Sequence, residues 1–153
     1  ESVFEEAYSW GTAAAAARLC VAASEDKLAW LERALERSSP HDFLRASLLT
    51  LLGEQKDPRA VGILRAWCVD EQASLKARAS AVRTLALITR SESGTAELLA
   101  GLLDAPHALK TAAVSGLAIS RTSLARRTLK AHYPSMIDPR QRRMVEASMQ
   151  GRY

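Results

Sequence analysis

Residues 45–53 read RASLLTLLG, residues 78–86 read RASAVRTLA, and three further segments of the chain follow the same pattern. These are TAAAAARLC at residues 12–20, KTAAVSGLA at residues 110–118 and RRMVEASMQ at residues 142–150. Successive segments start 32 or 33 residues apart, and each has a polar, usually basic, first residue and Leu or Met at the eighth position. A fixed period of this length predicts a repeated supersecondary unit that runs along the chain.

Apolar residues recur within these segments at helical spacing, as in the row Ala46, Leu49 and Leu52. This spacing predicts an amphipathic helix with a wide face of small residues. A second helix is expected after each of the first four segments, at residues 26–37, 58–68, 95–103 and 123–133. Gly53 lies where a first helix should stop, and Asp57-Pro58 is a typical start for the helix that follows.

Two stretches carry a resemblance to a known family. Residues 51–67, LLGEQKDPRAVGILRAW, resemble the joint between helices in HEAT-like repeats of the phycobilin-lyase type, and residues 74–86, SLKARASAVRTLA, resemble the first-helix pattern of that family. The resemblance implies an all-α fold, a right-handed α-solenoid of about five HEAT-like helix pairs. This sequence departs from the family pattern because Gly is missing after Leu85 and Leu117 and the last repeat lacks a second helix.

We therefore predict a single domain that spans all 153 residues. Its repeats are expected at approximately 11–37, 40–69, 73–104 and 106–134, with a partial repeat at 138–153 and a cap or incomplete repeat at 1–10. Ala and Leu dominate, aromatic residues make up only 5% of the chain, and no apolar run approaches the roughly 20 residues of a membrane span. Because residue 1 is Glu, not Met, we expect a processed product or part of a longer polypeptide.

The residues that usually carry catalysis or metal binding are not arranged for it. His41, His107 and His132 lie far apart, Cys20 and Cys68 have no CxxC spacing, and phosphate-binding glycine motifs are absent. HEAT-like iron hydroxylases carry His-Glu pairs, and this chain has no His-Glu dipeptide. We predict no catalytic residue, no metal and no cofactor, with the cysteines as small buried hydrophobes in a reducing, cytoplasmic setting.

A second apolar stripe lies beside the core stripe on the predicted second helices. Trp30 and Ile63 occupy equivalent positions one residue before the central Leu, and Trp67 follows Ile63 by four residues. In HEAT solenoids the second helices line the concave surface. These residues either fill the core between repeats or form an apolar groove with aromatic anchors, as binding surfaces favour.

Charge is concentrated at the C-terminal end, where residues 121–153 carry a net charge of +6. Arg126, Arg127 and Lys130 lie within the fourth second helix, and the spacing places Arg126 and Lys130 on one face. They form either a solvated face or a site for an anionic partner, which could be an acidic protein, a nucleic acid or a membrane surface. Little aromatic interleaving accompanies them, which disfavours nucleic acid.

These observations favour a non-catalytic scaffold for protein–protein interaction, one module of a larger assembly of bacterial type. Its predicted anchors are Trp30, Ile63 and Trp67, and its predicted electrostatic selectors for an acidic protein partner are Arg126, Arg127 and Lys130. One alternative is a nucleic-acid-binding HEAT-like protein that uses the basic end. The resemblance to phycobilin lyases makes a lyase-type or other enzyme subunit the second alternative.

Overall fold

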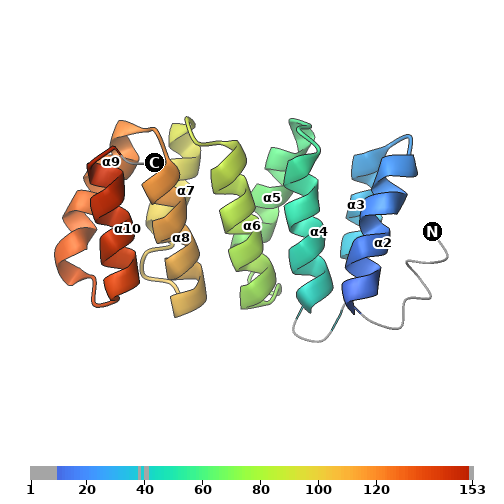
Figure 1. Cartoon of the computed structure of the whole chain (residues 1–153), viewed down its shortest axis with the longest axis horizontal. Helices are drawn as coiled ribbons and strands as arrows, with labels where there is room; N and C mark the ends of the chain where they lie inside the picture. Colours follow the sequence, from blue (N-terminus) through green and yellow to red (C-terminus); the bar gives the residue numbers. More distant parts are fainter. Residues whose placement is uncertain (1–9, 38, 40–41, 152–153) are drawn as a thin grey trace. The chain divides into compact units, whose positions relative to one another are not determined.

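The computed structural model describes residues 10–37, 39 and 42–151, and within these ranges it contains α-helices, one short 3-10 helix and no strand (Figure 1). The predicted all-α class is therefore confirmed. The chain divides into two compact units, residues 1–81 (unit 1) and residues 82–153 (unit 2). The cap predicted at residues 1–10 lies outside the described residues except for Trp10, where the first described helix begins. No helix among the described residues has the length and apolar character that crossing a membrane requires.

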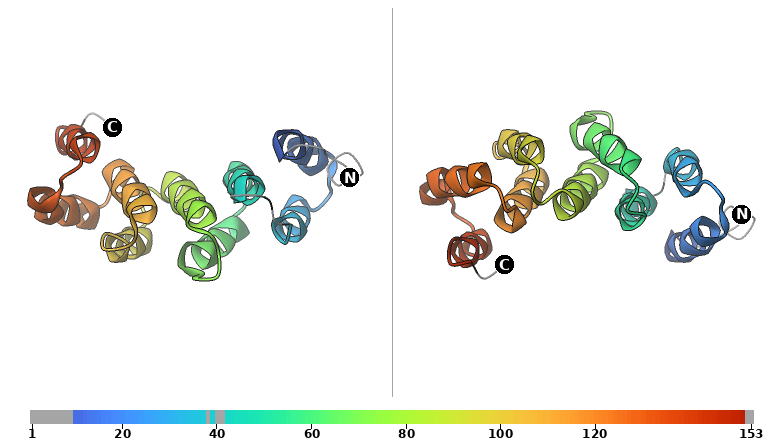
Figure 2. Two further views of the ribbon diagram at one scale, coloured as in Figure 1. Left: turned by 90° about the horizontal axis from the view of Figure 1, so that it is seen from below. Right: turned by 90° about the horizontal axis from the view of Figure 1, so that it is seen from above.

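Unit 1 is built from alternating first and second helices. Its helices are α2 (Trp10–Ala23), α3 (Lys27–Leu35), α4 (Phe43–Glu54), α5 (Arg59–Val69) and the first half of α6 (Leu75–Ile88). Helices α2 and α4 pack side by side in one layer, and α3 and α5 lie in a second layer (Figure 2). The aligned segments at residues 12–20 and 45–53 lie within α2 and α4, so both predicted first helices are confirmed.

The core of unit 1 is made of leucines contributed by both layers. Leu48, Leu49 and Leu52 of α4 are fully buried, as are Leu31 of α3 and Leu64 of α5. Full burial of each such side chain stabilises the fold by roughly 1.5–3 kcal/mol relative to leaving it in water. The leucine row read from the sequence is thus the buried face of α4.

Unit 2 has the same alternation of helices. It contains the second half of α6 and then α7 (Ser93–Gly101), α8 (His107–Ile119), α9 (Ser123–His132), the 3-10 helix η2 (Tyr133–Ser135) and α10 (Pro139–Met149). Helix α8 packs against α10 in one layer, α7 packs against α9 in the other, and α8 contacts both α7 and α9. The five predicted first helices and the four predicted second helices are all present.

Gly116 marks a close approach between helices in unit 2. A Cβ placed on this residue would lie 2.7 Å from the Cβ of Ala86 and 2.9 Å from a methyl carbon of Leu99. Both distances are shorter than carbon atoms normally adopt, so the backbones can approach this closely only because Gly116 has no side chain. The small residues that the repeat pattern places in its first helices thus allow tight packing of helices.

Polar side chains accept hydrogen bonds from backbone N–H groups at the starts of several helices. Asp26 accepts a hydrogen bond from Ala29 N at 3.1 Å, Thr122 accepts one from Ala125 N at 3.2 Å, and Asp138 accepts one from Arg140 N at 2.8 Å. Asp57 accepts one from Arg59 N at 2.8 Å, although α5 begins one residue after Pro58. Each bond satisfies a backbone donor that the first turn of a helix leaves unpaired.

Two residues at the eighth position of the pattern are exposed, and the predicted end of one helix is shifted. Leu19, at the eighth position of its segment, is 73% exposed, because the buried face of α2 runs through Ala13, Ala17 and Val21. Gly53 does not end its helix, since α4 continues to Glu54 and the left-handed turn with φ 56° falls on Lys56. Met149, the eighth residue of the last segment, is also 47% exposed.

Candidate functional site

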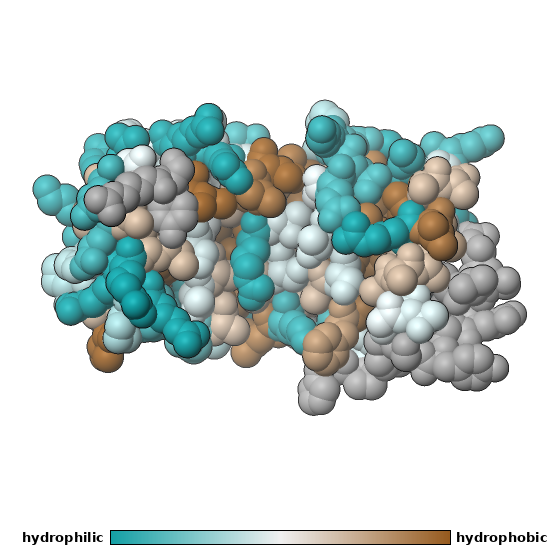
Figure 3. Space-filling view, viewed as in Figure 1, coloured by the Kyte–Doolittle hydropathy of each residue, from teal (hydrophilic) through white to brown (hydrophobic). Residues whose placement is uncertain are grey.

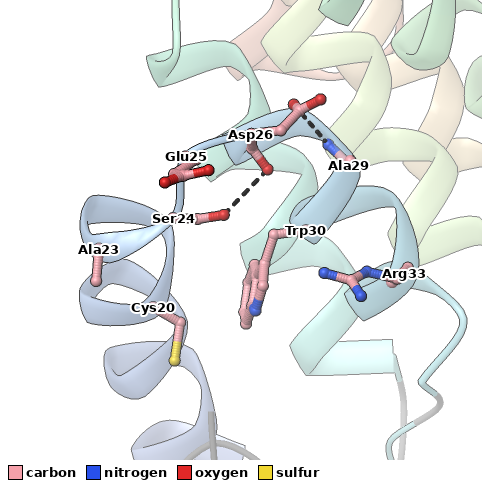
Figure 4. A pocket seen from close by; sticks show the side chains of 8 residues that line it. All are labelled: Cys20, Ala23, Ser24, Glu25, Asp26, Ala29, Trp30 and Arg33. Atoms are coloured by element: carbon pink, nitrogen blue, oxygen red, sulfur yellow. Dashed lines mark hydrogen bonds between the residues drawn. The ribbon is translucent and has the colours of Figure 1, made fainter.

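Trp30, the first predicted anchor, is buried and lines a pocket between two helices. Its side chain is only 5% exposed and lies between α2 and α3, with Cys20 across from it (Figure 4). An open pocket of about 500 Å³ lies beside it, lined by residues of the two helices and of the turn between them. Trp30 therefore fits the core-filling interpretation of the apolar stripe and is not an exposed anchor.

The polar groups of this pocket serve the turn between α2 and α3. The Ser24 hydroxyl donates to Asp26 O at 3.1 Å, and the Asp26 carboxylate caps α3 through Ala29 N (Figure 4). Both groups are thereby committed to local structure.

Ile63 and Trp67, the other two predicted anchors, lie together on one groove in unit 1. Both belong to α5 and are half-buried. The groove has a volume of about 300 Å³, and its lining comes from α3, α4 and α5. We call it the α3–α5 groove and define it by Glu32, Leu35, Glu36, Arg45, Ile63 and Trp67. The structure thus brings two of the three predicted aromatic and aliphatic anchors together.

Arg45 holds this groove in place from the start of α4. Its Nε donates to Leu35 O at 2.9 Å and a terminal nitrogen donates to Glu36 O at 3.2 Å, both at the C-terminal end of α3. The other terminal nitrogen lies 3.4 Å from the carboxylate of Asp42. The guanidinium also lies 5.8 Å from the centre of the Trp67 ring, within the range of a cation–π interaction. The Trp67 ring therefore packs against an arginine side chain that is itself hydrogen-bonded to backbone carbonyl groups of α3 and its C-cap.

Arg78 repeats part of this arrangement one period later. It occupies the same position of the pattern as Arg45, and its Nε donates to Cys68 O at 3.2 Å, near the C-terminal end of α5. A cation at this end satisfies carbonyl groups that lack a helical partner and suits the negative end of the helix dipole. The sequence showed that the first position is usually basic, but it did not show this role.

Arg126, Arg127 and Lys130, the predicted electrostatic selectors, are exposed on α9 in unit 2. Ala125 and Leu129 of the same helix are buried, so the basic residues lie away from the core. None of the three cations takes part in an ion pair within the ranges that the structure describes. Unit 2 as a whole carries eleven Lys and Arg against five Asp and Glu, a net charge of +6.

Tyr133 contacts one acidic and one basic residue of α10 in unit 2. Its hydroxyl donates to the Glu146 carboxylate, and the Arg142 guanidinium lies 5.4 Å from the centre of its ring. The hydrogen bond to Glu146, together with desolvation, raises the pKa of Tyr133. Tyr133 and Arg142 thus link the end of α9 to α10, which gives both residues a structural role.

The surface over the first helices of unit 1 also has a pocket, of about 380 Å³, which lies between α2 and α4 and is lined largely by alanine and leucine side chains and by Arg18, Ser47 and Thr50. Figure 3 is viewed onto this layer, where hydrophilic and small residues separate a few apolar patches. The exposed apolar side chains of first helices include Leu19 of α2 and Leu87 and Ile88 of α6. The α3–α5 groove differs from the pocket between α2 and α4 because large apolar side chains, Ile63 and Trp67, line it.

The two cysteines are free thiols in different environments. Cys68 is fully buried, and burial raises the pKa of its thiol to about 12. A thiol that stays protonated is neither a nucleophile nor a metal ligand at neutral pH. The prediction of a small buried hydrophobe is confirmed for Cys68, whereas Cys20 is only partly buried.

Histidines and carboxylates do not gather into a metal site in the described part of the chain, where no group of three or more His, Cys, Asp or Glu lies close enough to hold an ion. His107 is exposed at the start of α8, and His132 lies in the last turn of α9. His41 lies outside the described residues.

No protein-family model, no curated protein and no solved structure matches this chain. The HEAT-like assignment therefore depends on the repeat pattern of the sequence, and it stays a prediction.

Proposed function

We propose that this chain is a non-catalytic scaffold for protein–protein interaction and that its second helices carry the binding surface. The observation that carries the proposal is the α3–α5 groove, where Ile63 and Trp67 are held half-exposed over a cavity of about 300 Å³. Large apolar side chains that a rigid framework keeps partly in water are typical anchors of protein interfaces. Because the Arg45 guanidinium packs over the Trp67 ring, part of the side-chain entropy of Trp67 is already lost before binding.

The proposed architecture is a right-handed, HEAT-like solenoid of about five helix pairs that forms a single domain. Support comes from the 32- to 33-residue period and from the alternation of first and second helices within each unit. In such an array each pair buries its apolar face against its neighbours and leaves one curved surface for a partner.

Selection of short peptides displayed on phage, with the immobilised chain as target, tests the function. We expect enriched peptides to lose binding to the double variant Ile63→Ala/Trp67→Ala. The matched control is Leu87→Ala/Ile88→Ala, which removes exposed apolar side chains from α6 and should leave binding intact. Urea unfolding separates binding from folding, because core residues would cost about 2–5 kcal/mol each on truncation. The proposal is contradicted if Ile63→Ala/Trp67→Ala loses that much free energy of unfolding and no enriched peptide depends on Ile63 or Trp67.

A nucleic-acid-binding function is the second candidate. The cations of α9 favour it because they are exposed and form no ion pair with any residue that the structure describes. Filter binding with duplex DNA at two salt concentrations tests this candidate. Binding that weakens steeply with salt, and weakens again in Arg126→Gln/Arg127→Gln/Lys130→Gln, supports it, because each phosphate contact releases counterions. Absence of binding at low salt removes it.

A further inference from the structure

The α3–α5 groove has a negatively charged rim above an apolar floor. Glu32 and Glu36 are exposed and line the groove, and their spacing of four residues places both carboxylates on one face of α3. Neither carboxylate takes part in an ion pair within the described residues. The floor consists of buried Leu35 and half-buried Ile63 and Trp67.

Arg45, the cation that lines the groove, already has hydrogen-bond and ion-pair partners within the chain. Its guanidinium donates to Leu35 O and Glu36 O, lies against the Asp42 carboxylate and packs over the Trp67 ring. Asp42 balances its charge. Glu32 also interacts electrostatically with Arg59 of α5, which lies outside the lining, and the carboxylates of Glu32 and Glu36 are the acidic groups on the groove. These carboxylates also stand at the C-terminal end of α3, where the helix dipole disfavours negative charge.

The size of the groove limits what can occupy it. A volume of about 300 Å³ is at the low end of the roughly 300–1,000 Å³ found for small-molecule sites. The apolar floor suits an aliphatic or aromatic side chain, and the rim suits a cation next to that side chain. A cation on the rim would relieve both the repulsion between two like charges and their conflict with the dipole.

From this geometry we infer that the α3–α5 groove binds a basic peptide segment of another protein, one with a Lys or Arg close to an apolar side chain. The apolar side chain contacts Ile63 and Trp67, and the basic residue pairs with Glu32 and Glu36. An acidic segment is repelled at this site. The inference rests on the proposed scaffold function and specifies the chemistry of the partner at one site.

The peptides selected on phage test this inference. Enriched sequences that depend on Ile63 and Trp67 should carry Lys or Arg near a Leu or aromatic residue. A synthetic copy of one such peptide should bind Glu32→Gln/Glu36→Gln with a Kd about five-fold higher at low ionic strength, the effect of exposed ion pairs. The control Glu25→Gln/Glu71→Gln removes the same charge from exposed positions outside the groove and should change the Kd less than two-fold.

The outcomes separate the two proposals. Peptides that need Ile63 and Trp67 but carry acidic or no charges, or that bind Glu32→Gln/Glu36→Gln unchanged, overturn the inference and leave the scaffold function standing. If no enriched peptide depends on Ile63 or Trp67, both proposals fail. Urea unfolding should find Glu32→Gln/Glu36→Gln at least as stable as the parent chain, so a change in Kd reports on binding.

Discussion

Arg45 and Arg78 show how one position of the repeat can serve packing of helices. Each lies near the start of a first helix and donates to a carbonyl ten residues earlier, at the end of the preceding second helix. The basic character of the first position thus has a structural cause. From sequence alone, these arginines could be taken for ligand-binding residues. In the structure, their guanidinium groups are hydrogen-bonded to the backbone.

Replacing either arginine with Ala should weaken the joint between helices. We expect Arg45→Ala and Arg78→Ala each to lower the free energy of unfolding by about 1–2 kcal/mol, because carbonyl groups lose a charged hydrogen-bond donor and water only partly replaces it. The measurement is urea unfolding followed by circular dichroism. Arg83→Ala, at an exposed position of α6, should change stability by less than about 0.5 kcal/mol. Equal effects at all three positions would contradict the assigned role.

Because of Cys68, we expect the free energy of unfolding to depend on pH in the alkaline range. In the folded protein its buried thiol has a pKa of about 12, whereas in the unfolded chain it ionises near the ordinary value of 9.0. Below about pH 9 both states keep the proton and the contribution to stability is complete. Between about pH 9 and about pH 12 only the unfolded state releases the proton, so stability falls as the pH rises.

A comparison of the parent chain with Cys68→Ala isolates this effect. Across the alkaline window the parent chain should lose more free energy of unfolding than the variant, since losses from other groups are common to both. The urea midpoint at neutral pH and at several alkaline values provides the measurement. Parallel pH profiles for the two proteins would show that the thiol ionises freely in the folded state.

At the scale of the helix, the period of apolar residues was sufficient to place the elements. All the predicted helices appear because the periodicity is a local property of the sequence. The orientation of α2 could not be read in the same way. Five consecutive alanines, residues 13–17, give no contrast between its faces, and the aligned apolar residue Leu19 is 73% exposed. Packing against α3 and α4 decides that orientation.

Glycines within helices should respond to Ala in opposite directions. Gly116→Ala should destabilise the chain by about 1–3 kcal/mol, because the new Cβ overlaps Ala86 and Leu99 and the helices must separate. Gly62→Ala in α5 has open space around its Cβ and should stabilise the chain by about 0.5–1 kcal/mol. Thermal unfolding of both variants checks the signs. A stabilising Gly116→Ala would mean that this close approach does not exist in solution.

At the scale of the molecule, the sequence predicted the candidate site only in part. Trp30 and Ile63 occupy equivalent positions of the pattern, yet the larger Trp30 is buried and Ile63 is half-exposed. The difference arises from what packs beside each residue, which the period does not specify. The acidic rim was missed because Glu32 and Glu36 join the site only when α3 and α5 lie together. Conversely, exposure of Arg126, Arg127 and Lys130 followed from a local helical pattern.

The proposed stack of repeats has a consequence for how the chain unfolds. In a solenoid each repeat contacts only its neighbours, so a local weakness should spread over adjacent repeats before it reaches distant ones. Hydrogen–deuterium exchange of Gly116→Ala, compared with the parent chain, measures this spread. We expect faster exchange in α7, α8 and α9 of unit 2, with the protection of α3 and α4 in unit 1 little changed. A uniform rise of exchange in both units would show that the chain unfolds as one cooperative block and would contradict the expected local spread.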